Sequence, residues 1–116
     1  MNYKGSCHCG RVTYEVEVEP RAALECNCSI CSRRGYLLWF TPRSHLNIIK
    51  GEDSLAAYTF GHHAIKHMFC PNCGCAPFGI GKPAGAETET VAVNVRCLED
   101  VDLAAIPVQH YDGRAL

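Results

Sequence analysis

The chain has 116 residues, 47% of them hydrophobic, which fits one domain with a modest core. Its formal net charge of −1 offers no basic field for a phosphate backbone, and this argues against a nucleic-acid partner. No apolar run approaches the roughly 20 residues that cross a bilayer, and residues 1–10 lack the apolar segment of a secretory signal. We therefore expect a single cytoplasmic domain over residues 1–116, with no membrane partner.

The first part of the chain predicts two strands with a helical turn between them. Hydrophobic and polar side chains alternate over residues 11–18 with the period of a half-buried strand. Residues 29–34 predict a short helical turn, because Gly35 follows them in the position of a helix cap. The aromatic and aliphatic residues 36–41 predict the second strand.

The later part of the chain predicts further strands. A turn signal follows the expected strand of residues 45–50. Residues 55–60 and 64–69 predict a hairpin, and residues 76–80 predict the next strand. Valines alternate with other residues over 90–96, which is typical of one more strand.

The remaining segments predict little regular structure. Residues 81–89 are rich in Gly, Ala, Pro and Thr and predict a surface loop. Acidic side chains near the start of residues 98–106 suit a second helical turn. We expect Trp39 and Phe40 to belong to the core. The fold class expected from these elements is mainly β with short helical turns.

Nine cysteines make the strongest signal in the sequence. Because the cysteine count is odd and no export signal is seen, the pattern favours metal binding or catalysis over disulfides, which would leave one cysteine unpaired. Cys75 and Cys97 stand outside the closest pairings, and we expect them to be buried small hydrophobic residues. The other seven cysteines form three short-spaced clusters: Cys7 and Cys9; Cys26, Cys28 and Cys31; Cys70 and Cys73.

Ligand counting predicts one closed metal site. A structural zinc takes four ligands in a tetrahedron, and Cys-x-Cys and Cys-x-x-Cys spacings each bring two sulfurs to one ion. Cys7, Cys9, Cys70 and Cys73 together supply four thiolates, from parts of the chain that lie far apart in sequence. We interpret them as the ligands of a structural zinc.

The middle cluster then holds three thiolates: Cys26, Cys28 and Cys31. A zinc ion with three protein ligands keeps a position for water or substrate, which is typical of a catalytic site. Two alternatives stay open. Cys26 and Cys28 could instead pair with Cys70 and Cys73, or a histidine or carboxylate could complete a second structural site.

Three motifs and two closing segments resemble the glutathione-dependent formaldehyde-activating enzyme family, also called the GFA or CENP-V/GFA family. The motifs are Gly5-Ser6-Cys7-His8-Cys9-Gly10, Cys26-x-Cys28-x-x-Cys31 and Phe69-Cys70-x-x-Cys73-Gly74. The closing segments are Val93-Asn94-Val95-Arg96-Cys97-Leu98 and Tyr111-Asp112-Gly113. The resemblance runs over residues 4–114, and order, spacing and length agree.

The resemblance implies an Mss4-like fold, in which antiparallel sheets are organised around zinc. It implies two Zn²⁺ sites with the same division of cysteines: a structural site at Cys7, Cys9, Cys70 and Cys73, and a catalytic site at Cys26, Cys28 and Cys31. The activity of the family joins glutathione and formaldehyde into S-(hydroxymethyl)glutathione and is classed as carbon–sulfur lyase chemistry.

Two functions compete at this point. The first is a zinc-dependent carbon–sulfur lyase-like enzyme that acts on the adduct of a small thiol, such as glutathione, with a small aldehyde. The second is a non-catalytic zinc-binding module that binds another protein. The three-cysteine cluster favours the enzyme. Thiol redox chemistry at Cys70 and Cys73 is disfavoured, because no βαβ pattern surrounds them.

Other side chains are weaker candidates. His67 precedes Cys70 in a predicted strand and is a candidate partner for a metal-ligating cysteine. Arg33 and Arg34 follow Cys31 and could hold a substrate carboxylate, although a solvated pair is the simpler interpretation.

Overall fold

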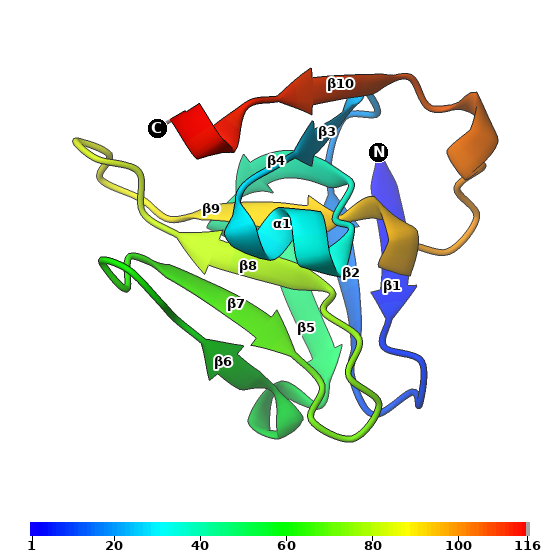
Figure 1. The fold of residues 1–116 in the computed structure, drawn as a ribbon. Helices are drawn as coiled ribbons and strands as arrows, with labels where there is room; N and C mark the ends of the chain where they lie inside the picture. Colours follow the sequence, from blue (N-terminus) through cyan, green and yellow to red (C-terminus); the bar gives the residue numbers. More distant parts are fainter. Residues whose placement is uncertain (116) are drawn as a thin grey trace.

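The chain folds into two β-sheets, shown in Figure 1 as a computed structural model that describes residues 1–115. The smaller sheet has three antiparallel strands in the order β1-β2-β5. Its strands are β1 (Asn2–Ser6), β2 (Thr13–Glu17) and β5 (Leu46–Lys50).

The larger sheet has seven strands in the order β10-β3-β4-β9-β8-β7-β6. Its strands are β3 (Ala23–Cys26), β4 (Leu38–Pro42), β6 (Ala56–Tyr58), β7 (Ile65–Phe69), β8 (Phe78–Gly81), β9 (Thr90–Asn94) and β10 (Val108–Tyr111). All neighbours are antiparallel except β10 and β3, which run parallel, with Tyr111 opposite Cys26. The last strand therefore covers the segment that carries the middle cysteines.

Helical structure is confined to short pieces. The helix α1 (Ser29–Arg34) lies in front of the larger sheet in Figure 1. The 3₁₀ turns are η1 (Arg43–His45), η2 (Glu52–Ser54), η3 (Val95–Cys97), η4 (Leu103–Ala105) and η5 (Gly113–Ala115). None of the helices in the described part of the chain is long and apolar enough to cross a membrane.

The core lies where the inner faces of the two sheets meet. Tyr14 and Val16 of β2 pack in one cluster with Trp39 of β4 and Val93 of β9. Their burial follows from the alternation of side chains along each strand. Each such buried side chain contributes about 1.5–3 kcal/mol to stability. The indole N–H of Trp39 donates to the Arg21 carbonyl at 2.8 Å, so the one polar atom of this ring is satisfied.

The mainly β class and the short helix are confirmed, whereas the prediction for Phe40 is wrong. In β4 the side chains of Trp39 and Phe40 point to opposite faces, so Trp39 is 2% exposed and Phe40 is 41% exposed. The strand predicted over residues 90–96 ends at Asn94, whose side-chain oxygen accepts a hydrogen bond from the Arg96 N–H at 3.2 Å and begins η3.

Candidate metal centres

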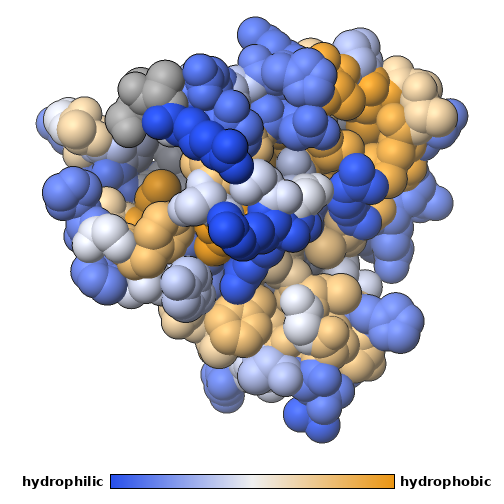
Figure 2. Space-filling view, in the orientation of Figure 1, coloured by the Kyte–Doolittle hydropathy of each residue, from blue (hydrophilic) through white to orange (hydrophobic). Residues whose placement is uncertain are grey.

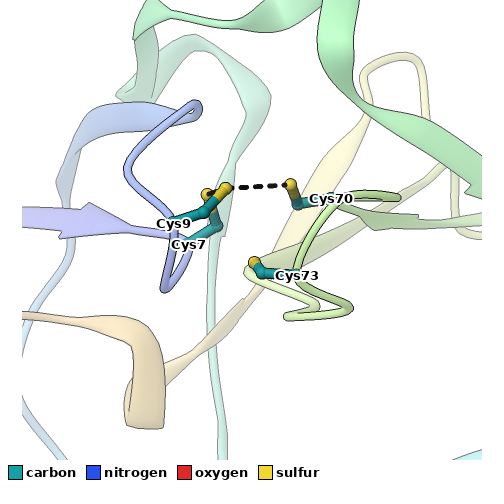
Figure 3. A group of neighbouring side chains, drawn as sticks. All are labelled: Cys7, Cys9, Cys70 and Cys73. Atoms are coloured by element: carbon teal, nitrogen blue, oxygen red, sulfur yellow. Dashed lines mark hydrogen bonds between the residues drawn. The ribbon is translucent and has the colours of Figure 1, made fainter.

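Four cysteine side chains converge between the two sheets. The Sγ atoms of Cys7, Cys9, Cys70 and Cys73 all lie within 4.8 Å of one another. Figure 3 shows the pairs facing each other from two separate turns. The sulfur of Cys9 lies 3.6 Å from that of Cys7 and 3.6 Å from that of Cys70. The structure therefore brings together the four residues that ligand counting had grouped.

The first pair is held by the turn after β1. The Cys7 N–H donates to the Val12 carbonyl at 3.1 Å, and the Gly10 N–H donates to the Cys7 carbonyl at 3.3 Å. Gly10 has a φ of 81°, a left-handed conformation that glycine adopts without strain. This closed turn aims Cys7 and Cys9 at one point.

The second pair is held by the turn after β7. The Cys70 N–H donates to the Cys75 carbonyl at 2.9 Å, and the Gly74 N–H donates to the Cys70 carbonyl at 2.7 Å. Interaction with the backbone N–H of Cys75 is the largest of the effects that lower the pKa of Cys73 to about 5. Cys73 is therefore predisposed to the thiolate form, which is the form that binds metals.

The sulfur spacing fits a zinc ion. A disulfide would hold two sulfurs about 2.05 Å apart, whereas the two measured pairs are 3.6 Å apart and all nine cysteines are free thiols. A regular tetrahedron with zinc–sulfur bonds of about 2.3 Å has edges of about 3.8 Å. The four-cysteine cluster thus has the donor set and the size of a closed zinc site.

Three further cysteines converge where β3 passes into α1. The Sγ atoms of Cys26, Cys28 and Cys31 lie within 4.8 Å of one another. Cys26 ends β3, Cys28 is the N-cap of α1, and Cys31 lies inside the helix. The Cys28 N–H donates to the Cys26 sulfur at 3.4 Å. Gly35 ends the helix with a φ of 70°, as its position after the cysteine motif predicts.

The three thiols differ in their electrostatic surroundings. Burial is the largest cause that raises the pKa of Cys31. Burial also acts to raise the pKa of Cys28, but the backbone N–H groups of Cys31 and Ile30 and the neighbouring thiols outweigh it, so the net shift is downward. The cluster consequently favours a thiolate at Cys28 before one at Cys31. Three soft sulfur donors suit Zn²⁺ with one coordination position left for another ligand.

The C-terminal segment closes over this cluster at Gly113. A Cβ atom at Gly113 would lie 2.5 Å from the Cys26 sulfur and 3.2 Å from the Cys28 Cβ, so any larger residue would displace a thiol. The Asn27 side chain holds this segment in place, because it donates to Asp112 at 2.9 Å and accepts from the Arg114 N–H at 3.0 Å. The resemblance had included residues 111–113 without indicating this role.

Two cavities flank the three-cysteine cluster, and both are lined by Cys26, Cys31 and Tyr111. One, of about 490 Å³, is the more polar of the two and also carries Glu25, Arg96 and Asp112 in its wall; it is called the polar cavity below. The other, of about 240 Å³, has an almost entirely apolar wall. The cluster is therefore accessible from a charged side and from a hydrophobic side.

His67 lies in the wall of the apolar cavity, close to the three-cysteine cluster. Its ring stacks on Tyr36 at 6.4 Å and on Phe60 at 5.5 Å between centroids. Burial, and then the charge of Arg34, lower the pKa of His67. The sequence had placed His67 beside Cys70. The residues of β7 do not alternate between buried and exposed, so no pattern in the sequence indicated the burial of His67 in this cavity.

The remaining candidates have structural partners. The Arg34 guanidinium donates to the Tyr36 hydroxyl at 2.8 Å and lies over the Tyr58 and Phe69 rings, while Arg33 donates to the Ser29 carbonyl at 2.9 Å. Cys75 and Cys97 are half-buried and belong to neither cluster in the described residues. Burial raises the pKa of Cys97 to about 11, which keeps that thiol protonated.

Comparison with known proteins agrees with this arrangement. A model of the family described as "Glutathione-dependent formaldehyde-activating enzyme" matches residues 2–112. A crystal structure of a Rhodobacter sphaeroides protein is similar over 91% of this chain and 99% of its own, with 34% sequence identity and a TM-score of 0.78. The family match spans both cysteine clusters and β10, and it ends at Asp112, just before Gly113. The chain belongs to the glutathione-dependent formaldehyde-activating enzyme family.

Proposed function

We propose that this protein is a carbon–sulfur lyase-like enzyme that joins a small thiol, such as glutathione, to a small aldehyde and cleaves the same bond in reverse. The observation that carries the proposal is the Cys26, Cys28 and Cys31 cluster, which offers three thiols and opens onto two cavities. Family membership supports the same chemistry.

In this proposal the two clusters have different roles. Cys7, Cys9, Cys70 and Cys73 would hold a structural zinc, because four thiols fill a tetrahedral site. Cys26, Cys28 and Cys31 would hold the catalytic ion. When bound there, Zn²⁺ supplies Lewis-acid polarisation and lowers the pKa of a thiol or water.

The side chains around the cluster would bind and orient the substrates. The polar cavity presents Arg96 beside Glu25 and Asp112, so it suits a thiol that carries both positive and negative charges. The apolar cavity offers water few polar partners on the other side of the cluster, and an apolar wall strengthens electrostatic interactions beside it. Both substrates would then meet beside Cys26 and Cys31.

In this proposal His67, which lines the apolar cavity together with the three cysteines, would hold a proton during the reaction. Because its pKa is lowered, the ring is neutral at neutral pH and offers one N–H donor and one nitrogen acceptor. In the forward direction the thiol proton leaves sulfur, the carbon–sulfur bond forms, and the carbonyl oxygen takes up a proton to become a hydroxyl. A neutral imidazole suits this transfer, since it can accept the first proton and donate the second.

The non-catalytic alternative requires a second closed site. Among the described residues, the second group of candidate ligands contains three cysteines and no fourth side chain within reach. A free coordination position beside two cavities favours substrate binding over a purely structural ion.

The test replaces one thiol of the three-cysteine cluster and, as a control, one thiol outside both clusters. Cys28→Ser should lower zinc content from two ions per chain to one and abolish turnover of glutathione with formaldehyde, while the protein stays folded. The matched control is Cys97→Ser, outside both clusters, which should keep both zinc ions and full turnover. Full turnover in folded Cys28→Ser protein would contradict the proposal.

A further inference from the structure

We propose that the carbonyl compound handled at the three-cysteine cluster carries an apolar group at least as large as a phenyl ring, an inference that rests on the proposed function. The observation behind it is the hydrophobic cavity that Cys26, Cys28 and Cys31 themselves line. A one-carbon aldehyde would use the reacting end of this cavity and leave its walls uncovered.

Four neighbouring strands of the larger sheet form a large part of the wall of the apolar cavity. Leu24 of β3, Leu38 of β4, Ala92 of β9 and Phe78 of β8 all line it. Pairing fixes their positions, because Leu24 lies opposite Leu38 and Phe78 lies opposite Val93. Paired strands therefore fix this part of the cavity, as a preformed ligand site requires.

The cavity volume sets the size of the group. An apolar cavity of about 150 Å³ in another protein takes up benzene, and the cavity here measures about 240 Å³. It therefore has room for a phenyl ring and a short chain that reaches the thiols. Formaldehyde, with one carbon and one oxygen, would leave most of this hydrophobic wall without a partner.

The hydrophobic surface continues outward from the cavity. A second apolar hollow, of about 400 Å³, shares Phe40, Ile65, Gly79 and Ala92 with the first. Phe40 and Ile65 are 41% and 49% exposed and both line the two apolar hollows, and adjoining exposed hydrophobic side chains mark interaction or ligand sites. In Figure 2, hydrophobic residues reach the surface on the left of the view, beside the strongly hydrophilic residues over α1. A longer apolar substituent would continue along this surface.

The two cavities suit different substrates. The charged residues Glu25, Arg96 and Asp112 lie only in the polar cavity, where a thiol with amine and carboxylate groups would be solvated. Apart from the three cysteines, the apolar cavity offers no charged side chain. The apolar group therefore belongs to the carbonyl partner and not to the thiol.

The step itself needs no further reactant. The sulfur of the thiol adds to the carbonyl carbon, the carbon–oxygen π bond breaks, and the thiol proton passes to the oxygen. The product is a hemithioacetal with no change in the total oxidation state. Cleavage reverses each of these movements.

The experiment compares phenylacetaldehyde with acetaldehyde, each with glutathione, on the zinc-loaded protein. Each buried CH₂ equivalent contributes about fourfold in affinity, so KM for phenylacetaldehyde should be at least tenfold lower. Ala92→Leu fills the cavity and should remove this difference. The matched control is Ala57→Leu, an exposed strand alanine away from the cavity, which should preserve it.

A binding measurement on the wild-type protein supports the same test without turnover. In a ¹H–¹⁵N NMR titration, phenylethanol should shift the amides of Gly79 and Ala92, whereas ethanol at the same concentration should not. This result does not depend on how well Ala92→Leu folds.

The possible failures are distinguishable. Turnover of both aldehydes with equal KM would overturn the apolar-substituent inference and leave the proposed function intact. Turnover of formaldehyde but of neither larger aldehyde would also overturn the inference alone, whereas turnover of none of the three would overturn the proposed function and the inference with it. If the amide chemical shifts changed with protein concentration and not with phenylethanol concentration, the apolar surface would bind a second copy of the chain. That result would also overturn the inference.

Discussion

At the scale of single residues, the burial of His67 lowers the affinity of its ring for a proton. Burial in the apolar cavity is the main cause of its lowered pKa, and the nearby Arg34 guanidinium adds to it. A neutral ring is easier to desolvate than a charged one, so the cavity disfavours protonation. The same histidine should therefore affect both stability and turnover as pH changes.

Stability should fall as pH decreases through the ordinary histidine pKa of about 6.5. Above that pH the His67 ring is neutral in both the folded and the unfolded chain, so it adds no pH dependence to the free energy of unfolding. Below it the unfolded chain binds a proton while folded His67 does not, so the free energy of unfolding decreases until the lowered folded pKa is reached. Urea unfolding of the zinc-loaded protein at several pH values measures this slope, which should be shallower in His67→Gln. The exposed His62→Gln serves as the control, and an equal slope in wild type and His67→Gln would contradict the prediction.

Gly113 makes a second prediction at this scale. In Gly113→Ala the new methyl group would lie 2.5 Å from the Cys26 sulfur, so that sulfur must move and the three-cysteine cluster should lose zinc more readily. Competition with a chromophoric chelator should release one of two zinc ions at least tenfold faster than in wild type. Gly79→Ala is the control, because its Cβ meets its neighbours no closer than 3.5 Å. If Gly113→Ala released zinc no faster than wild type, the C-terminal segment would have moved aside without displacing the Cys26 sulfur.

Among the elements, β10 depends on few interactions. All four of its residues are exposed, and it pairs only with β3. Its continuation is tied by the side chain of Asn27, which contacts Asp112 and the Arg114 backbone. This strand forms part of the wall around the three-cysteine cluster through Tyr111.

Asn27→Ala should loosen this wall without unfolding the protein. Two hydrogen bonds are lost, each worth about 1 kcal/mol or less at an exposed position. Hydrogen exchange of the amides of residues 108–114 should accelerate at least fivefold, while those of the buried strand β9 stay protected. If hydrogen exchange of residues 108–114 were equally slow in wild type and in Asn27→Ala, backbone pairing with β3 alone would hold the strand.

The elements also show what sequence alone can predict. Alternation identified β2 and β9 because each buries one face, and the glycine after the cysteine motif located the end of α1. Alternation did not indicate β10, because all four residues of that strand are exposed. The cysteine spacing predicted both clusters, since ligand pairs are local. The cavities and His67 were not predictable, because β3, β4, β8 and β9 must pair before they form.

At the scale of the whole molecule, the four-cysteine cluster links the two sheets. One pair follows β1 of the smaller sheet, and the other follows β7 of the larger sheet. A structural zinc in a small domain contributes apparent free energies of about 10–16 kcal/mol. Its loss should therefore affect global stability and not just local order.

Chelation should consequently unfold the protein in two distinguishable stages. Under mild chelation one zinc should leave with little change in the thermal midpoint. Removal of the second should abolish cooperative unfolding, and Cys70→Ser should do the same from the start, because Cys70 is fully buried. Calorimetry with parallel metal analysis measures both stages. A folded and cooperative Cys70→Ser protein would contradict the assignment of the structural site.

The separation of the two cysteine pairs along the chain has a consequence for biosynthesis. Cys9 and Cys70 are 61 residues apart, so the first pair leaves the ribosome long before the second has been made. During that interval the nascent chain carries the thiols of Cys7 and Cys9 without their two partners and cannot close the four-sulfur site. Closure over Cys26 comes later still, because Gly113 belongs to the last turn described. Metal loading should therefore follow translation, and zinc-poor cells should accumulate full-length but unfolded chains.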